Sequence, residues 1–276
     1  MDNGLDVTLL PASVSPLVAA EVAGAPRRRR VVAAFPTCLY VELGAHERVL
    51  AVLASDALAL PIGLRLALPS TRVSWGLEAG AHVVVGQGRV RLPGADVVAA
   101  RLQHPSRVRP APRRPGPPTG LREPGVLGDL AREMAAAALA GRSVDSGVRG
   151  LLGAGRGLTP SGDDAVCGVL LTLGAVDVPR ARRAHAAIAA EVRAGLGRTT
   201  SLSAALLVAA ASGYAVPDVV RLVTGLVSGT VSADLVDRVL GIGHSSGRDL
   251  LSGVTGTLRA LDASLETTPQ KGACRG

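Results

Sequence analysis

Residues 153–175 read GAGRGLTPSGDDAVCGVLLTLGA, a loop rich in glycine and hydroxyl groups that passes directly into an apolar run. Glycine permits positive φ angles and lets the backbone approach a ligand closely. The apolar run predicts a buried helix, and the first N–H groups of a helix lack partners within it. A loop of this kind at a helix start is typical of an oxyanion or carboxylate site. The alternative is a tight turn and an N-cap before a core helix, but the number of special residues favours a site.

The sequence before this loop predicts an α+β protein whose first part is rich in strands. Residues 1–30 predict a mostly irregular lead-in with one short helix. Residues 31–100 contain short valine-rich runs separated by Gly and Pro, which is typical of a sandwich or a barrel. The pair Gln87-Gly88 between two such runs predicts a hairpin. We therefore expect a β-rich N-terminal domain over residues 1–100.

The remaining sequence predicts a linker, a helical domain and a tail. Residues 101–124 are rich in Arg and Pro, which excludes a regular helix or a central strand and indicates an extended linker. Residues 125–263 show helical periodicity and predict an all-helical C-terminal domain that carries the glycine-rich loop. Residues 264–276 predict a disordered tail. The expected helices cover residues 127–140, 163–175, 179–194, 200–212, 217–228, 232–240 and 246–261.

An internal similarity links two of these helices at an offset of 85 residues. Ser161, Gly162, Asp164, Gly168 and Thr172 all recur as the same residue types 85 positions later, in the stretch 246–257. The spacing of four places the Asp, Gly and Thr on one helix face, and the glycines predict close packing of the two helices. Duplication and coincidence in a Gly- and Leu-rich chain both remain open at this point.

Composition limits the function classes. The chain has 276 residues and a formal net charge of +8, and Lys271 is its only lysine. A basic excess is found in nucleic-acid-binding proteins, but the 1% aromatic content leaves no stacking platform. A bias toward arginine explains the charge better, with small anionic ligands or acidic partners next. These features argue against nucleic acid as a partner.

Cysteine content and hydropathy indicate a cytoplasmic protein. Cys38, Cys167 and Cys274 are too few and too scattered for a disulfide framework or a metal site. The first residues are acidic and do not resemble a signal peptide. Apolar runs are interrupted by Gly, Pro or charge before they reach membrane-spanning length. We expect no membrane association.

The glycine-rich loop supplies the candidate anion-binding groups. Backbone N–H groups, two hydroxyls and one guanidinium would bind a phosphate or carboxylate, and the residues are Gly155, Arg156, Gly157, Thr159, Ser161 and Gly162. Gly-Lys-Ser/Thr is missing, so this is not a Walker loop. No clear βαβ unit surrounds it, which argues against a dinucleotide site.

Asp163 and Asp164 follow the loop and oppose a simple anion site. Carboxylates in the first turn stabilise a helix and cap it, yet they repel an anionic ligand. One aspartate caps while the other holds a ligand N–H or a hydrated Mg²⁺, or both are structural. We expect Asp163 to cap and treat Asp164 as a candidate catalytic group.

Two further helix starts carry candidate site residues. His244 is the only histidine in a Gly/Ser-rich run, and it is a candidate general acid–base group. The alternative is a helix-terminal residue bonded to the backbone. The candidate binding residues at these starts, several of which also suit an N-cap, are Arg198, Thr199, Thr200, Ser245, Ser246, Gly247 and Asp249. Spacing alone supports neither a Ser/His/Asp triad nor a metal-ligand cluster.

These three motifs carry a family resemblance. The run 153–164 fits the pattern G-x-G-x-G-L-T-P-S-G-D-D and, with 243–249 and the weaker 198–203, resembles the AllH-type oxamate carbamoyltransferase subunit family. The resemblance covers roughly residues 31–261, although only the motifs are specific. Ala165 stands where the family often has an aromatic residue, which puts the size of the ligand pocket in question.

The resemblance implies a subunit that works in allantoin breakdown with other, dissimilar carbamoyltransferase subunits. The implied reaction cleaves oxalurate with phosphate and gives oxamate and carbamoyl phosphate. Phosphate or carbamoyl phosphate is then the expected ligand, and Mg²⁺ is an optional one. The rival from another class is a non-catalytic subunit for small-molecule binding or assembly. In either case we expect the helix starts at Ser161, Thr200 and Ser246 to converge on one cleft, with Asp164 facing Asp249 and His244 at the rim.

Overall fold

The computed structural model describes residues 7–114 and 125–266. The chain forms two compact units, which we call the barrel unit and the helical unit. The barrel unit comprises the chain up to Arg107 together with Thr200–Pro217, and the helical unit comprises Val108–Thr199 and the chain from Asp218 onward. The α+β class is confirmed: an eight-stranded barrel precedes a helical region. Of the two β architectures expected, the barrel is the one observed.

The barrel closes by pairing its first and last strands. Its order is β1-β5-β4-β3-β2-β6-β7-β8, and β1 runs parallel to β8 from the pair Thr8–Ala95 to the pair Val14–Leu102. Val31, Leu39 and Leu64 are fully buried. The strands are β1 Thr8–Val14, β2 Arg27–Phe35, β3 Cys38–Glu42, β4 Val49–Leu53, β5 Gly63–Leu66, β6 His82–Gly86, β7 Arg89–Leu92 and β8 Ala95–Leu102, with short helices α1 Ala19–Ala23 and η1 Ser70–Arg72.

The strands expected over residues 31–100 are found, but the N-terminal lead-in differs from the expectation. Residues 1–30 were expected to be mostly irregular, whereas β1 occupies Thr8–Val14 and β2 begins at Arg27. Pro11 interrupts the sequence pattern of β1, and its partner β8 is distant in sequence, so no local signal marks this strand. The predicted hairpin is confirmed, since β6 and β7 flank Gln87 and Gly88, whose φ angles are 55° and 77°.

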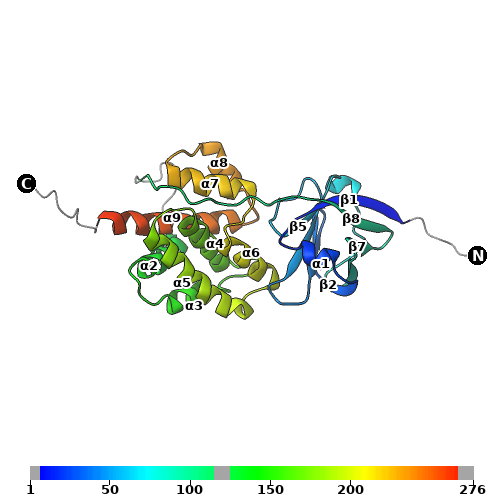
Figure 1. Ribbon diagram of the computed structural model, residues 1–276, viewed down its shortest axis with the longest axis horizontal. Helices are drawn as coiled ribbons and strands as arrows, with labels where there is room; N and C mark the ends of the chain where they lie inside the picture. The colour runs from blue at the N-terminus through cyan, green and yellow to red at the C-terminus, as the bar shows by residue number, and fades with distance from the viewer. Residues whose placement is uncertain (1–6, 115–124, 267–276) are drawn as a thin grey trace, which may run out of the picture. The chain divides into compact units, whose positions relative to one another are not determined.

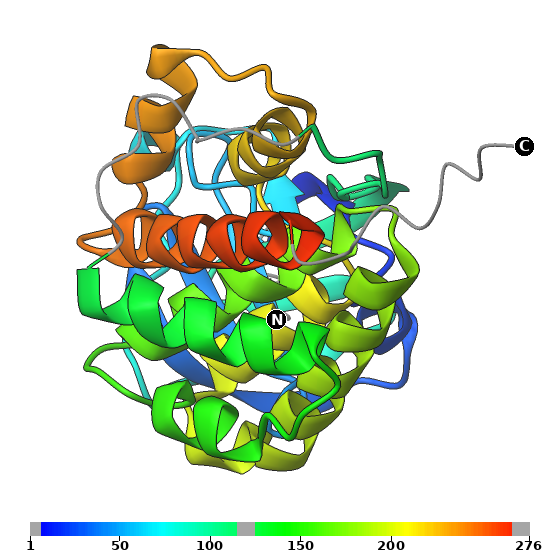
Figure 2. The ribbon, with the colours of Figure 1, turned by 90° about the vertical axis from the view of Figure 1, so that its left-hand side faces the viewer.

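The helical unit is organised around α4, a helix that is buried from Gly162 to Leu173. Helix α9 packs against both α2 and α4, and it lies along α2 in both views of the ribbon (Figures 1 and 2). One helix, α3, was not predicted. The helices after the barrel are α2 Gly125–Leu139, α3 Asp145–Leu151, α4 Ser161–Gly174, α5 Pro179–Gly195, η2 Leu196–Arg198, α6 Ser201–Ala211, α7 Pro217–Ser228, α8 Ala233–Leu240 and α9 Ser246–Glu266.

Helix α6 belongs to the barrel unit, although the sequence groups it with the other helices. It contacts β4, and nine of its eleven residues are buried. A helix that is apolar on all sides needs partners on every face. Its contact with β4 lies within the barrel unit, and periodicity within the helix does not reveal it.

Part of the expected linker is packed rather than loosely attached. Val108 is buried, and Ala111 forms a β-bridge with Val176. The Arg113 guanidinium donates to both carboxylate oxygens of Asp262, at 2.9 and 2.7 Å, and its side chain is 2% exposed. Extended Pro-rich backbone still carries carbonyl and amide groups that can pair with neighbouring segments. Residues 115–124 of the linker and 267–276 of the tail lie outside the described residues, and α9 reaches Glu266.

Within the part of the chain that the structure describes, every helix is too short or too polar to cross a lipid bilayer.

Candidate functional site

Helices α4 and α9 touch backbone to backbone through two glycines. A Cβ atom at Gly168 of α4 would lie 2.2 Å from the carbonyl oxygen of Leu250. A Cβ atom at Gly253 of α9 would lie 2.0 Å from the carbonyl oxygen of Ala165. Leu250 and Ala165 are themselves 85 residues apart, as are the two glycines. The contact is therefore reciprocal: each helix presents its glycine to the equivalent carbonyl of the other.

The reciprocity extends to the helices that precede this pair. A Cβ atom at Gly162 would lie 2.0 Å from the carbonyl oxygen of Leu151, at the end of α3. A Cβ atom at Gly247 would lie 1.8 Å from the carbonyl oxygen of Val239, near the end of α8. The unit α3–loop–α4 thus repeats as α8–loop–α9, with a longer loop in the first copy.

Two threonines complete the repeated pattern. The Thr172 hydroxyl donates to the carbonyl oxygen of Gly168 at 2.7 Å, and the Thr257 hydroxyl donates to that of Gly253 at 2.8 Å. Equivalent residues therefore make equivalent contacts over two helix–loop–helix units. This geometry favours duplication over coincidence as the origin of the sequence similarity.

The repeat brings two carboxylates and two hydroxyls together. Asp164 and Asp249 occupy equivalent positions in the first turns of α4 and α9, and each residue is 8% exposed. The Thr159 and Ser246 hydroxyl oxygens are 3.0 Å apart and join the glycine-rich loop to the start of α9. Among the described residues, the Oδ2 atoms of both aspartates are buried without a hydrogen-bond partner.

Burial controls the protonation of Asp164. Loss of solvation raises the pKa of this carboxyl to about 7, and the nearby charges of Asp249 and Asp163 also raise it. Hydrogen bonds from Ser246 and Thr159 act in the opposite direction and lower the pKa. Asp164 consequently exchanges a proton near neutral pH, which is the property required of a general acid or base.

Asp163 has a structural role that joins two loops. It is fully buried, and its Oδ1 accepts a hydrogen bond from the Gly153 N–H at 2.7 Å. The Thr199 hydroxyl donates to its Oδ2. We expected this residue to cap α4, but the start of the helix has no side-chain cap hydrogen bond, and these two bonds go to the loops before α4 and before α6. They hold the glycine-rich loop against the segment that precedes α6.

The glycine-rich loop runs tightly over the start of α4. Gly155 has a φ of 126°, and a Cβ atom there would lie 2.7 Å from the Ser161 nitrogen. The N–H of Gly162 donates to the carbonyl oxygen of Ala154 at 2.8 Å. The N–H groups of Asp163 and Asp164 donate to that of Pro160 at 2.9 and 3.2 Å. These amides, which the sequence offers to an oxyanion, are therefore already bonded within the protein.

The start of α9 repeats this internal bonding. The Gly247 N–H donates to the carbonyl oxygen of Ile242 at 3.0 Å, and the Asp249 N–H donates to that of Ser245 at 2.9 Å.

At the start of α6, the Thr200 hydroxyl accepts a hydrogen bond from the Ser203 N–H at 3.1 Å and caps the helix. The N-cap alternative for Thr200 is thus observed.

Three charged or titratable candidates lie on the surface of the helical unit. Arg156 and His244 are exposed and lie in the loops that lead into α4 and α9. Arg198 is also exposed, and its guanidinium donates to the carbonyl oxygen of Arg149 at 3.3 Å. None of the described contacts joins these three side chains to Asp164 or Asp249.

Of the predicted site residues, the structure therefore gathers Thr159, Asp164, Ser246 and Asp249. Thr199 joins the same region through Asp163. The start of α6 belongs to the barrel unit, so the expected convergence of three helix starts stays a prediction for that one. The described residues contain no group of three or more His, Cys, Asp or Glu arranged to hold a metal ion.

Comparison with known proteins adds one finding. Residues 151–258 match the family model described as oxamate carbamoyltransferase subunit AllH. The matched region contains all three motifs and both copies of the repeated helix start, whereas the strands of the barrel lie outside it. No curated protein and no solved structure matched the chain. Over residues 151–258 the chain is thus similar to the AllH family of oxamate carbamoyltransferase subunits, which confirms the resemblance that its motifs indicate.

Proposed function

We propose that this chain is a carbamoyltransferase subunit that acts on oxalurate and phosphate in allantoin breakdown, with Asp164 as its proton-transferring residue. The observation that carries the proposal is the contact between two family motifs around one buried carboxyl. Thr159 and Ser246 come from motifs 87 residues apart, and both act on an Asp164 whose pKa is about 7. Structural carboxyls on helix starts are more often exposed and ionised.

The proposed reaction requires a proton at a specific atom. A phosphate oxygen attacks the ureido carbonyl carbon of oxalurate, and the bond from that carbon to the amide nitrogen breaks. The departing nitrogen takes a proton and becomes the amide of oxamate, while the carbamoyl group leaves as carbamoyl phosphate. A carboxyl that keeps its proton near pH 7 suits this transfer. The Oδ2 of Asp249 is a hydrogen-bond acceptor suited to the N–H groups of a carbamoyl moiety.

The anionic part of the substrate needs positively charged groups or backbone N–H donors, which the Asp164 and Asp249 side chains do not supply. The first-turn amides of α4 and α9 are bonded internally, so we assign this role to Arg156 and His244, which are exposed on the two loops. Other subunits of the enzyme would complete this side of the site. In this proposed function, the chain transfers the proton in the cytoplasm. The chain and its partner subunits bind the anion together.

The rival function is a non-catalytic assembly subunit. The first-turn amides of α4 and α9 donate to carbonyl oxygens of the protein itself. A helix pair with only a structural role has its amides bonded in this way, so this observation favours the assembly function. The two functions make opposite predictions for Asp164, which only the first uses in chemistry.

Replacing Asp164 by Asn tests the proposed function directly. In the complex assembled with its partner subunits, Asp164→Asn is expected to lower the rate of carbamoyl phosphate formation at least about 100-fold, the usual range for loss of a general acid. Asn keeps the size of the protonated carboxyl but cannot give up a proton at the same place. The measurement is carbamoyl phosphate released from oxalurate and phosphate.

Asp234→Asn is the matched control, because Asp234 is an exposed carboxylate in the first turn of α8. It is expected to leave the rate within about twofold of the unaltered complex. Equal rates for the unaltered and Asp164→Asn complexes would support the assembly function instead.

The purified chain alone is expected to show little or no carbamoyl transfer, because the anion-binding side of the site is incomplete without partner subunits. The assay is the same release of carbamoyl phosphate, run with and without the partners. Full turnover by the isolated chain would rule out a shared site.

A further inference from the structure

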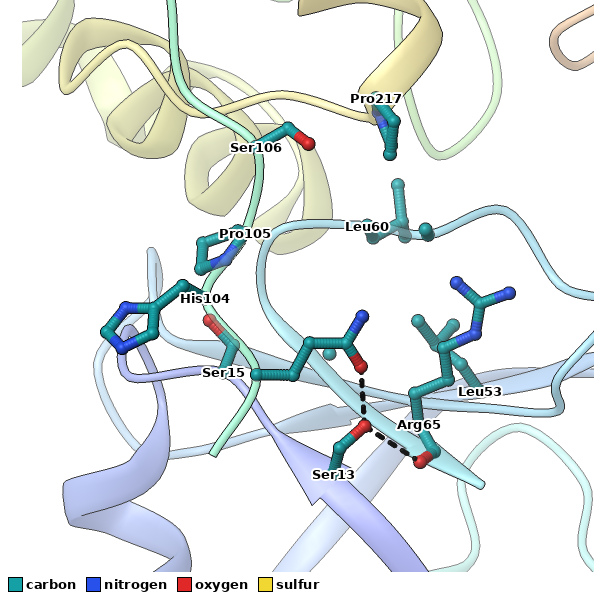
Figure 3. A pocket seen from close by; sticks show the side chains of 12 residues that line it. Ser13, Ser15, Leu53, Leu60, Arg65, His104, Pro105, Ser106 and Pro217 are labelled. Carbon is teal, nitrogen blue, oxygen red and sulfur yellow. Dashed lines mark hydrogen bonds between the residues drawn. The ribbon is translucent and has the colours of Figure 1, made fainter. Parts of the chain in front are cut away.

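The barrel unit contains a small pocket with a mixed polar and apolar lining on the outer face of its sheet (Figure 3). Ser13 of β1 and Leu53 of β4 both pair with Arg65 of β5, so the three residues form a row across neighbouring strands. Leu64 and Leu66, on the opposite face of β5, are buried in the barrel core. Ser13 is nevertheless only 5% exposed, because other segments cover the outer face at this point. The polar residues that line the pocket are Ser13, Ser15, Arg65, Gln103, His104 and Ser106.

The covering segment, residues 103–106, is held in place by backbone hydrogen bonds. The Gln103 N–H donates to the carbonyl oxygen of Val14 at 2.9 Å, and the Ala215 N–H donates to that of Ser106 at 3.2 Å. The next residue, Arg107, donates to the Ser212 carbonyl oxygen at 2.9 Å. The covering segment is therefore fixed at both of its ends by hydrogen bonds within the barrel unit.

The pocket contains one guanidinium, that of Arg65, whose charge interacts at longer range with the Asp56 carboxylate. No Asp or Glu lines it, and within the described residues Arg65 has no carboxylate at ion-pair distance. One guanidinium nitrogen, Nη2, donates to the Ser55 carbonyl oxygen, which anchors the side chain. The nearby Asp56 carboxylate is occupied by the N–H and hydroxyl of Ser70, at 2.8 and 2.6 Å.

Neutral donors accompany the guanidinium. The Ser13 hydroxyl donates to Oε1 of Gln103 at 2.6 Å, which leaves the Nε2 hydrogens of this amide for another acceptor. Figure 3 shows Arg65 rising from the sheet and Ser106 reaching from the covering segment, while His104 lies on the far side of the pocket from Arg65. The polar side chains around the space thus include a guanidinium and an amide that both donate hydrogen bonds.

We propose that this pocket binds a small oxyanion, a carboxylate or a phosphate, through Arg65 and the Gln103 amide. The cavity volume is about 60 Å³, and one buried water needs roughly 10–15 Å³ of the same measure. An ion of four or five non-hydrogen atoms fits this space. A guanidinium matches the paired oxygens of such ions better than it matches chloride. The site lies in the barrel unit and is separate from Asp164, so it does not depend on the proposed carbamoyl transfer.

Nuclear magnetic resonance of the full chain with ¹⁵N-labelled arginine tests the site with two probes, acetate and inorganic phosphate, at constant ionic strength. Saturable shifts of the Arg65 side-chain signal are expected with at least one probe. Arg65→Gln, uniformly labelled with ¹⁵N and followed through the backbone amide signals of Gln103, His104 and Ser106, is expected to weaken binding at least about tenfold, because a charge-assisted hydrogen bond is lost. Gln103→Leu removes the neutral donor and is expected to weaken binding about threefold to tenfold.

Arg91→Gln is the matched control, because Arg91 is an exposed arginine on β7 of the same barrel. It is expected to leave both affinities unchanged. Tighter binding of acetate than of phosphate would identify a carboxylate site, and the reverse order a phosphate site. The proposal is overturned if neither anion gives saturable shifts, or if folded Arg65→Gln binds as tightly as the unaltered chain. Thermal unfolding of each variant establishes that it is folded.

Discussion

Gly168→Ala is expected to lower the free energy of unfolding of the helical unit by at least about 3 kcal/mol, the upper part of the range for overpacking. The added Cβ would lie 2.2 Å from the Leu250 carbonyl oxygen and 2.9 Å from the Val254 nitrogen. Both obstacles are backbone atoms of α9, so no side-chain rotation relieves the clash. The helices must move apart, and the fully buried side chains around them lose contact. Urea denaturation followed by circular dichroism measures the change.

Gly150→Ala provides the matched control for this prediction. Gly150 is also a helical glycine, in α3, but no atom lies within 4 Å of the position its Cβ would take. Alanine there is expected to stabilise the protein by up to about 1 kcal/mol through helix propensity. Gly253→Ala should behave like Gly168→Ala, because its Cβ would meet the Ala165 carbonyl oxygen at 2.0 Å. Similar stabilities for Gly168→Ala and Gly150→Ala would contradict the close helix crossing.

The second large effect is a pH dependence of stability that originates at Asp164. Its pKa is about 7 in the folded protein, against an ordinary value of 3.8. Between these values the folded state keeps a proton that the unfolded state releases. The free energy of unfolding is therefore expected to fall as pH rises from about 4 to about 7, by about 4 kcal/mol from this residue alone. Below pH 4 the stabilising contribution is fully present, and above pH 7 it is lost.

Comparison with Asp164→Asn isolates this contribution from all other titrating groups. Asn does not ionise, so the variant should match the unaltered protein near pH 4 and exceed its stability by about 4 kcal/mol near pH 8. The exposed Asp234→Asn variant should show no such pH-dependent difference. Chemical denaturation at several pH values gives the curves. A constant difference between the Asp164→Asn and unaltered proteins across this range would show that Asp164 is ionised throughout.

The effects of Asp164→Asn on stability and on carbamoyl transfer are expected to have the same cause. An ionisable group that destabilises the fold at neutral pH has an evident reason to be there if it serves in chemistry. If Asp164→Asn gains stability near pH 8 and loses carbamoyl transfer, the same carboxyl accounts for both changes. A gain in stability with activity unchanged would leave Asp164 as a structural residue and favour the assembly function.

The local signals in the sequence predicted most of the helices, the β6–β7 hairpin and the equivalence of Asp164 and Asp249. Each of these depends on residues close in sequence: a 3.6-residue period, a Gln-Gly turn, or a helix start of defined composition. The fold class followed from the change between valine-rich runs and helical periodicity. The tight loop at Gly155 also follows from its glycines, because their φ angles exclude most other residues.

Apart from the predicted packing of the helices that begin near Ser161 and Ser246, the sequence did not reveal which of these parts would meet. Strand β1 was missed because Pro11 disrupts its pattern and its partner β8 lies more than 80 residues away. The bonding of the helix-start amides within the protein, and the direct contact of Thr159 with Ser246, also depend on partners outside the local segment.

The sequence by itself determined where most helices and turns begin, which residue types stand at each helix start, and the similarity of residues 151–258 to the AllH family. The close approach of two helices through Gly168 and Gly253 was predicted from the repeat and is confirmed, whereas only the tertiary structure decided that the barrel closes through β1 and β8 and that Asp164 is buried. The physical reason is that backbone propensity acts over a few residues. Burial, and with it the pKa of a carboxyl, is set by segments that come together only when the chain folds.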